Sequence, residues 1–432
     1  MTPSFWIVLS LLALSLLALA FTGNSLYARL SYLWGGLLMV GWVWSRWALR
    51  GIRVRRRARV RRTQVGEVFE EQFEVRNESR FPCAWLEIHD RSTLPGSRGS
   101  RVLIGLKGRE VRSYLAHVRL VQRGVFPLGP TEIRSGDPFG LFPVRRVIPP
   151  EGSLVVYPMT VEVLAFPRPP GLLPGGDALR RRTHQVTPNA STVREYGPGD
   201  PLNRIHWPST ARRNRLMVKE FELDPRAEVW LLVDGAREVH AALPHAPPVR
   251  YTDVLGYLWA RMKLLPSTEE YAVCAAASLG RYFLRRGRAV GLVGSGPSLQ
   301  VLPPDRGGRQ LLKILEALAL FSAKGELSLL AMVTVQSHHL PRGSTVVLIT
   351  PSVGEEVLIA VDILLRKALR PVAVLLDAAS FGGPPGTTDL EATLVGMGVS
   401  ACRIVCGEDL GEALSRLAAA PLGARVLSRA RV

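Results

Sequence analysis

The chain has 432 residues, 47% hydrophobic and 21% charged, so it is long enough for several folding units and too apolar to be disordered. Its 55 Lys and Arg against 36 Asp and Glu give a net charge of +19, which would favour nucleic acid or an anionic surface if it were spread evenly. Four cysteines are too few for a disulfide framework in a chain of this length, which excludes a small disulfide-stabilised fold.

The first predicted element is an apolar helix at the amino terminus. No charge precedes Arg29, and residues 5–21 read FWIVLSLLALSLLALAF, close to the length that crosses about 30 Å of hydrocarbon. Residues 26–47, rich in Leu, Gly and Trp, predict a second span in which Arg29 extends toward the headgroups. The alternative is a cleaved signal peptide with ALA at residues 18–20 as the cleavage site, although no basic residue precedes the apolar run.

Nine arginines lie between Arg46 and Arg62, and no acidic residue appears before Glu67. Such a flank stays in the cytoplasm, so we expect a multi-pass protein of the cell membrane with its soluble domains on the cytoplasmic side. The stretch from Arg50 to Arg62 is expected to contact anionic lipid, worth about 1 kcal/mol per charge. This contact would account for much of the net charge without a specific nucleic-acid partner.

After a membrane anchor at residues 1–49, residues 50–166 are predicted to form a β-domain. Ile52, Val54 and Ala58 alternate with arginines, which predicts a first strand with its basic face turned outward. Further strand-length runs recur between turn residues, about seven in all, and indicate an immunoglobulin-like β-sandwich.

One loop of this domain, residues 136–142, reads GDPFGLF and has Asp, Pro and Gly at turn-forming spacing. Aspartate is favoured in turns because its carboxylate accepts hydrogen bonds from nearby backbone N–H groups. We therefore expect Asp137 to cap the turn rather than act as a catalyst, with two phenylalanines holding the loop to the core.

The rest of the chain divides into a linker with a signature segment, residues 167–225, and an α/β domain, residues 226–432. The linker begins PRPPGLLPGG, a composition typical of exposed connections. Beyond it, apolar strand-like runs alternate with helical patterns, which predicts a parallel sheet covered on both faces. Helices are expected at about residues 251–265, 269–286, 308–323, 355–370 and 390–398. Ligands of such sheets bind beyond the carboxyl ends of the strands.

Several common chemical signatures are missing from the sequence. GSGPS at residues 294–298 lacks the third glycine of a dinucleotide loop, and no Walker sequence occurs, so we predict no nucleotide cofactor. Cys402 and Cys406 are expected to be buried thiols on one face of a strand rather than a zinc pair.

A hydrolytic site is an alternative. Ser191, Asp200, His206 and Ser209 could supply a nucleophile, a base and an orienting carboxylate. No nucleophile elbow accompanies them, and serine or histidine in a loop is more often a packing residue. We therefore predict a protein that is not an enzyme, with a hydrolase in the His206 and Asp200 region as the alternative.

The most distinctive stretch covers residues 193–222 and reads VREYGPGDPLNRIHWPSTARRNRLMVKEFE. Its six basic and four acidic side chains are nearly balanced, which favours a fixed arginine–carboxylate network over a phosphate-binding site. Such a network could be a structural clasp between domains or a docking surface, and the two roles are compatible. The predicted partner-binding residues are Arg194, Glu195, Tyr196, Gly199, Asp200, Arg204, His206, Trp207, Arg212, Arg213 and Lys219.

This stretch resembles the signature of the domain of unknown function 58 family, and residues 122–142, QRGVFPLGPTEIRSGDPFGLF, resemble the segment that commonly precedes it. The resemblance implies a von Willebrand factor A-like, Rossmann-like α/β domain. It also implies a partner, because members are commonly encoded beside MoxR-type AAA+ ATPases.

The metal site of that domain is not carried over. A metal-binding von Willebrand factor A domain has Asp-x-Ser-x-Ser after its first strand, whereas here Asp234 is followed by Ala236 and Glu238. The later carboxylate is also replaced, by Pro351 and Ser352. We therefore expect no metal and no cofactor, with Asp234 as the remnant of a degenerate site or the cap of the next helix.

The sequence thus predicts a multidomain membrane protein: a transmembrane helical hairpin, a β-sandwich, then an α/β domain. The predicted function is that of a non-enzymatic adaptor or scaffold for a MoxR-type AAA+ ATPase, in assembly or maturation of envelope or protein complexes. A basic nucleic-acid-binding membrane protein is the remaining alternative.

Overall fold

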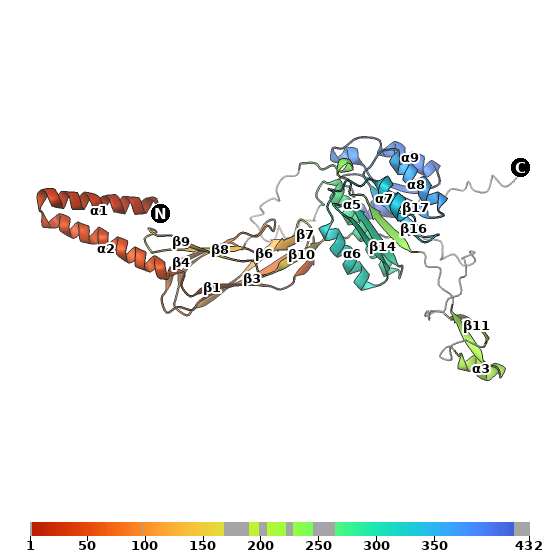
Figure 1. Cartoon of the computed structure of the whole chain (residues 1–432), viewed down its shortest axis with the longest axis horizontal. Coiled ribbons are helices and arrows are strands. Elements are labelled where there is room, and N and C mark those ends of the chain that lie inside the picture. Colours follow the sequence, from red (N-terminus) through yellow and green to blue (C-terminus); the bar gives the residue numbers. More distant parts are fainter. Residues whose placement is uncertain are drawn as a thin grey trace. The chain divides into compact units, whose positions relative to one another are not determined.

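The computed structural model describes residues 2–97, 99–167, 190–197, 205–221, 228–244 and 264–418. Contacts divide the chain into two compact units (Figure 1). The first contains Met1–Met159, with a helix pair and several small sheets. The second contains Thr160–His245 and Lys263–Val432, with a mixed, mostly parallel α/β sheet.

Two helices open the first unit, α1 (Pro3–Thr22) and α2 (Ser25–Ala48). Gly23 ends α1 in the left-handed conformation, with φ of 65°, and the Asn24 side chain then caps α2. Among the described residues, α1 is the one helix long and apolar enough to cross a membrane by length and composition, which fits either an anchor or a signal sequence. The predicted second span is a 24-residue helix, α2, that packs along α1.

Ten strands follow in three small sheets. The first is antiparallel, in the order β1 (Ile52–Ala58), β3 (Val68–Asn77), β6 (Val111–Arg119). The second is antiparallel, in the order β5 (Arg101–Leu106), β4 (Cys83–Asp90), β8 (Thr131–Ser135), β9 (Val144–Ile148). The third has the order β2 (Arg62–Gln64), β10 (Ser153–Tyr157), β7 (Gly124–Pro127), with β2 parallel to β10.

The first two sheets share one hydrophobic core. Ile52 and Val54 of β1 and Phe73 of β3 are buried in the same cluster as Leu86 and Ile133 of the second sheet. This arrangement follows from the predicted alternation of apolar residues along β1.

The second unit contains a six-stranded sheet in the order β15-β14-β13-β16-β17-β18. Its strands are β13 (Val229–Val233), β14 (Val290–Ser295), β15 (Leu299–Asp305), β16 (Thr345–Thr350), β17 (Arg370–Leu376) and β18 (Ser400–Ile404). Its helices are η2 (Arg237–Val239), α5 (Thr268–Arg285), α6 (Gly308–Leu320), α7 (Leu329–Gln336), α8 (Glu356–Arg366), η3 (Ala378–Phe381), α9 (Thr387–Gly396) and α10 (Leu410–Arg416).

Helices lie on both faces of this sheet (Figure 1). Leu232 and Leu348 belong to a buried cluster with residues of α7, α8 and α9. Leu231, on the opposite face, lies beside Gly280 of α5, where an added Cβ would be 3.6 Å from it. The predicted α/β class is therefore confirmed as a mixed, mostly parallel sheet.

Several predicted details need correction. The sheet is not fully parallel, because β15 pairs antiparallel with β14 at one edge. The helix expected at residues 355–370 ends at Arg366, since Ala368 has φ of 55° and Arg370 already begins β17. The helix expected at residues 251–265 falls largely outside the described residues.

Residues 160–167, at the predicted end of the β-domain, make hydrogen bonds to helices of the α/β unit. The Val161 N–H donates to the Ser278 hydroxyl at 2.9 Å, and the Phe166 N–H donates to the Tyr282 hydroxyl at 3.0 Å. The first unit therefore ends at Met159, and residues 160–166, predicted as the end of the β-domain, belong to the second unit.

Candidate functional site

The signature module consists of β11 (Ala190–Glu195), α3 (Trp207–Arg213) and β12 (Met217–Phe221). β11 and β12 pair antiparallel, with Glu195 opposite Met217. The Tyr196 N–H donates to the Leu216 carbonyl and the His206 N–H to the Met217 carbonyl, both at 2.8 Å. These bonds bring both ends of the intervening segment against β12, so α3 is held close to the hairpin.

A hydrogen bond ties α3 to β12, because the Met217 N–H donates to the Thr210 hydroxyl at 3.0 Å. Ile205, Met217 and Val218 are buried, at 8%, 2% and 2% exposure. Pro208 occupies the first turn of α3, Asn214 ends it in the left-handed conformation, and no residue of α3 is itself buried.

The short helix α3 carries one exposed aromatic and two exposed basic side chains. Trp207 is 67% exposed, so most of its large apolar surface is open to solvent. Arg212 and Arg213 follow in the last turn of α3 and are also exposed. Of the predicted partner-binding residues, the described structure thus brings these three onto one short helix.

An ion pair of the predicted network joins two described residues of the module. The Arg215 guanidinium lies 3.0 Å from the Glu195 carboxylate, with the two side chains 73% and 63% exposed. An exposed pair of this kind contributes only about 0–1 kcal/mol. The described part of the module is therefore held by β-pairing and apolar packing more than by charge.

Part of the predicted surface lies outside the described residues. This applies to Gly199, Asp200 and Arg204, and the structure describes only the backbone of Arg194 and Lys219. Tyr196 is described and half-buried.

His206 and Ser209 lie close together, with Nδ1 2.7 Å from the hydroxyl oxygen. Ser209 is three residues further on, and its N–H also donates to the His206 carbonyl at 3.0 Å. The pair is thus a local contact at the start of α3. The other two candidates for the alternative hydrolytic site, Asp200 and the Ser191 side chain, lie outside the described part.

A second polar cluster lies at the carboxyl end of β13. Asp234 is fully buried, and its carboxylate accepts hydrogen bonds from the Thr350 hydroxyl at 2.7 Å and the Ala236 N–H at 3.1 Å. His240 Nε2 lies 2.9 Å from the Asp234 carbonyl. Burial raises the pKa of Asp234, and the Thr350 and Ala236 hydrogen bonds oppose that rise.

The residues around Asp234 do not fit the metal that the resemblance implies. Ala236 has no ligating side chain, and Glu238 is exposed in η2 rather than buried beside Asp234. Within the described ranges, no three His, Cys, Asp or Glu side chains gather as a set that could hold a metal ion. Asp234 instead joins β13 to β16 through Thr350, a role that the sequence does not reveal because the two residues are 116 positions apart.

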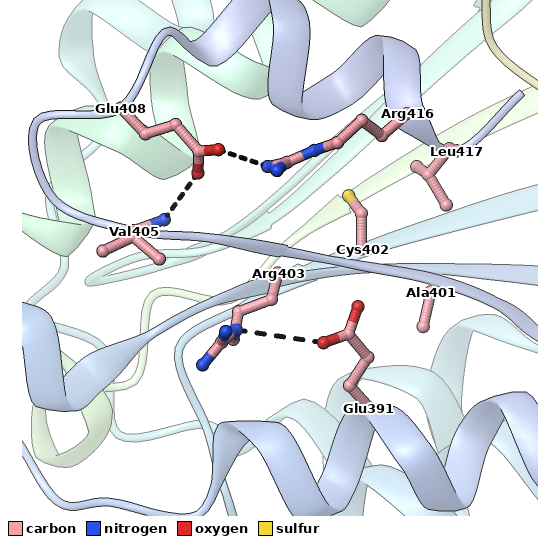
Figure 2. A pocket seen from close by; sticks show the side chains of 8 residues that line it. All are labelled: Glu391, Ala401, Cys402, Arg403, Val405, Glu408, Arg416 and Leu417. Carbon is pink, nitrogen blue, oxygen red and sulfur yellow. Dashed lines mark hydrogen bonds and ion pairs between the residues drawn. The ribbon is translucent and has the colours of Figure 1, made fainter. Parts of the chain in front are cut away.

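A cavity of about 470 Å³ lies beside β18 (Figure 2). Arg403 faces Glu391 of α9 at 3.9 Å on one side of the strand, and Arg416 of α10 pairs with Glu408 on the other. Cys402 in its wall is buried, whereas Cys406 lies past the end of β18 and is partly exposed. The expectation of two buried thiols on one strand is therefore wrong for Cys406, because the strand ends at Ile404.

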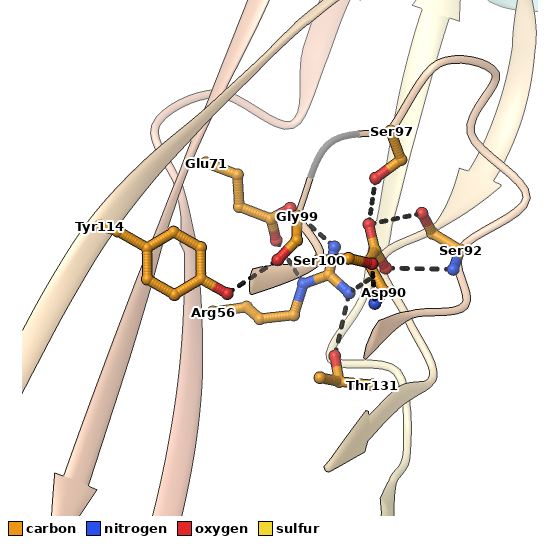
Figure 3. Close-up of polar contacts among 9 residues, drawn as sticks. All are labelled: Arg56, Glu71, Asp90, Ser92, Ser97, Gly99, Ser100, Tyr114 and Thr131. Atoms are coloured by element: carbon orange, nitrogen blue, oxygen red, sulfur yellow. Dashed lines mark hydrogen bonds and ion pairs between the residues drawn. The ribbon is translucent and has the colours of Figure 1, made fainter. Parts of the chain in front are cut away.

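The β-domain contains a buried ionic cluster that the sequence did not predict (Figure 3). Arg56 forms two hydrogen bonds to Glu71, at 2.6 and 2.7 Å, and one to Asp90 at 2.8 Å, with its side chain only 7% exposed. Thr131 accepts a further bond at 3.1 Å. The expectation that the β1 arginines face outward is therefore wrong for Arg56. Arg56 is an even number of residues from Ile52 and Val54, so the alternation of β1 already places its side chain on the same inward face.

Comparison with known proteins gives a family match on the signature module. Residues 192–241 match the family described as protein of unknown function DUF58. The uncharacterized protein YeaD of Bacillus subtilis is 24% identical over 204 residues, which cover 46% of this chain and 43% of that protein. The chain therefore matches less than half the length of this distant homologue.

Solved structures give weaker likenesses. A CARDB domain from Pyrococcus furiosus aligns with 24% of this chain and 91% of that domain, at 11% identity and a TM-score of 0.19. A GH20 exo-β-N-acetylglucosaminidase from Vibrio harveyi aligns with 76% of this chain and 57% of that enzyme, at 7% identity and a TM-score of 0.18. At such TM-scores neither likeness establishes a shared fold.

Proposed function

Since residues 192–241 carry a DUF58 family domain, we propose that the chain is a membrane-anchored, non-enzymatic adaptor for a MoxR-type AAA+ ATPase. Its role is assembly or maturation of envelope or protein complexes, and the signature module supplies the docking surface. The observation that carries the proposal is the exposure of Trp207, Arg212 and Arg213 on α3. Tryptophan and arginine are the residues that most often dominate binding energy in protein interfaces.

The contacts that hold α3 in place favour the interpretation of the module as a docking surface rather than as a loose surface loop. α3 is tied to the hairpin by the hydrogen bond from the Met217 N–H to the Thr210 hydroxyl, and Ile205, just before α3, is bridged to Val218 of β12. A side chain displayed on a fixed element loses less conformational entropy on binding than one on a mobile loop. Little reorganisation is then needed for a partner to contact Trp207.

The finer architecture belongs to the same proposal. We assign α1 and α2 as a transmembrane hairpin, the sheets β1-β3-β6 and β5-β4-β8-β9 as an immunoglobulin-like sandwich, and the α/β unit as von Willebrand factor A-like. The buried hydrogen bond between the Ser15 and Ser31 hydroxyls, at 3.1 Å, supports a retained helix pair over a cleaved signal. The arginine flank supports a cytoplasmic location and contact of Arg50–Arg62 with anionic lipid.

Capture of the ATPase tests the proposal. We expect the full chain in lipid nanodiscs to capture a purified MoxR-type ATPase from the same genome, and Trp207→Ala or Arg212→Glu to abolish capture. Both side chains are exposed, so thermal unfolding is expected to stay unchanged. Arg342→Glu, an exposed charge reversal in the turn before β16, is the matched control and keeps capture.

Two outcomes contradict docking. Unchanged capture by both variants would show that α3 does not contact the ATPase. A large drop in unfolding temperature for Arg212→Glu would favour the clasp, in which the module holds parts of this chain together.

The two alternatives make different predictions. The 2.7 Å contact between His206 and Ser209 is the observation that favours a hydrolase, for which Ser209→Ala would abolish turnover of a chromogenic ester and leave ATPase capture intact. A nucleic-acid binder would keep salt-sensitive binding after deletion of the predicted anchor, residues 1–49, combined with Arg53→Ser and Arg55→Ser on the exposed phase of β1.

A further inference from the structure

We propose that the membrane-facing end of the β-domain enters the bilayer surface, with Phe139 inserted among the lipids beside the helix pair. The inference rests on the proposed membrane anchoring and is independent of any ATPase. Its basis is residues 136–142, here called the interface loop, which pack against both helices.

The interface loop has a fixed shape. The buried Asp137 carboxylate accepts hydrogen bonds from the N–H groups of Phe139, Leu141 and Phe142, at 3.0, 3.1 and 2.6 Å. The Trp85 ring N–H donates to the Asp137 carbonyl at 3.3 Å, which ties the loop to β4. The prediction that Asp137 caps this turn is thus confirmed, and the cap determines where the two phenylalanines point.

The loop is fastened to both helices. The Thr2 hydroxyl donates to the Gly140 carbonyl at 2.9 Å, and the Phe5 and Phe142 rings meet edge to face at 5.3 Å. On α2, a Cβ added to Gly41 would lie 3.3 Å from the Phe142 ring, so only glycine leaves the ring its full space. Phe142 therefore packs where the first turn of α1 approaches α2.

The length of α1 sets the depth of this contact. Its 20 residues give a helix of about 30 Å, which equals the hydrocarbon thickness of a bilayer. Phe5 is two residues from Pro3, the first residue of the helix, or about 3 Å along its axis. Phe142, in contact with Phe5, then lies at the boundary between hydrocarbon and headgroups.

Phe139 belongs to the same turn and is 54% exposed. A phenylalanine held at this level gains by transferring its ring from water to hydrocarbon. The Asp137 cap fixes the backbone on either side, so insertion needs no rearrangement of the loop.

A second group of side chains marks the headgroup layer. Trp47 is 46% exposed and meets Phe81, 59% exposed, edge to face at 5.5 Å, while the Arg50 guanidinium lies 4.7 Å from the Trp47 ring. Trp47 is six residues after Gly41, or about 9 Å along α2. This step leads from the hydrocarbon boundary into the headgroups, where tryptophan and arginine are enriched.

Spin-label depth measurement tests the inference. Single cysteines at Leu16, Phe139 and Val125 are labelled with a nitroxide in the full chain, reconstituted in phosphatidylcholine and phosphatidylglycerol vesicles. Oxygen concentrates in hydrocarbon, whereas a nickel chelate stays in water, so their relative collision rates report depth. Leu16 is on α1, and Val125 is an exposed apolar residue of β7, at the opposite end of the β-domain (Figure 1). Cys406 is replaced by Ser throughout, because the other native cysteines are buried.

We expect the label at Phe139 to lose nickel accessibility and gain oxygen accessibility relative to Val125, in the direction of Leu16. A label at Phe139 as nickel-accessible as that at Val125, with Leu16 protected, would overturn the inference and leave the anchor intact. A nickel-accessible Leu16 would overturn the anchor and the inference together. Neither result bears on capture of the ATPase.

Discussion

Arg56 places its guanidinium at an inward position of β1, between the sheets β1-β3-β6 and β5-β4-β8-β9. Both of its acidic partners are nearly buried, with Glu71 5% and Asp90 2% exposed at the side chain. Burial alone would raise the pKa of Asp90, but hydrogen bonds from Arg56 and Ser97 hold that pKa below its ordinary value. A lowered folded-state pKa stabilises the domain at neutral pH, and this contribution is lost as the pH falls through the folded-state value.

Removing this guanidinium leaves two nearly buried carboxylates without their cationic partner, although Asp90 keeps its hydrogen bonds from Ser92 and Ser97. Arg56→Met is expected to destabilise the β-domain by about 3–5 kcal/mol, measured by urea unfolding followed by hydrogen-exchange mass spectrometry of β3 and β4 peptides. Arg55→Met, on the exposed phase of the same strand, is the control and should change stability by no more than about 0.5 kcal/mol. Equal effects of the two substitutions would contradict the buried role of Arg56.

Asp234 has the opposite pH dependence. Burial raises its pKa, so the folded state holds the proton more tightly than the unfolded state, and stability falls as the pH rises from the unfolded value through the folded one. Asp234→Asn should remove this fall, and Thr350→Val should enlarge it by removing a bond that favours the carboxylate. Urea unfolding at about pH 5 and about pH 8, followed by hydrogen exchange of peptides from β13 and β16, measures the change in unfolding free energy with pH.

Thr345→Val is the control for Thr350→Val on the same strand, because the Thr345 hydroxyl is buried with no hydrogen-bond partner in the described structure. It should be neutral or stabilising at either pH. A pH-dependent loss in Thr345→Val as large as that in Thr350→Val would contradict the assignment to Asp234.

At the scale of elements, the interface loop depends on one carboxylate that accepts three backbone N–H bonds. Asp137→Ala leaves these donors, of which the Leu141 N–H is buried, without their acceptor and should cost about 1–3 kcal/mol. Hydrogen exchange at Phe139 to Phe142 should accelerate, while β7 peptides stay protected. Unchanged exchange in the loop would show that packing against α1 and α2 holds it without the cap.

Elements with strong periodicity are the ones that the sequence predicted well. The alternating apolar runs and helical patterns anticipated β13, β16 and β17 and the helices α5 and α6. The antiparallel direction of β15 could not be inferred, since pairing direction depends on a partner strand and not on local pattern.

Functional and polar sites are harder to predict than helices and strands, because they depend more on contacts between residues far apart in the sequence. The pairing of Asp234 with Thr350 joins residues 116 positions apart, and no local spacing reveals it. The inward position of Arg56, by contrast, could be read from the alternation of β1. The prediction placed it outward because arginine is charged. In the signature module the sequence predicted Trp207, Arg212 and Arg213 as surface residues, and each of them is exposed on α3.

At the scale of the whole molecule, an apolar helix pair and a β-domain form the first unit and the α/β sheet the second, and we propose that the chain acts as a membrane-anchored platform. The helix pair and the interface loop bear the proposed contact with lipid, and the signature module bears the proposed contact with a partner protein. The contacts are separable by mutation, because Phe139 and Trp207 belong to different units.

The most direct test is the dissociation constant between the full chain in nanodiscs and a MoxR-type ATPase, measured for the unmodified protein and for Trp207→Ala. Loss of an exposed tryptophan at an interface is expected to weaken binding by about tenfold or more, which corresponds to about 1.4 kcal/mol. An unfolding temperature equal to that of the unmodified chain would show that the loss arises at the contact. A dissociation constant unchanged by Trp207→Ala would contradict the account.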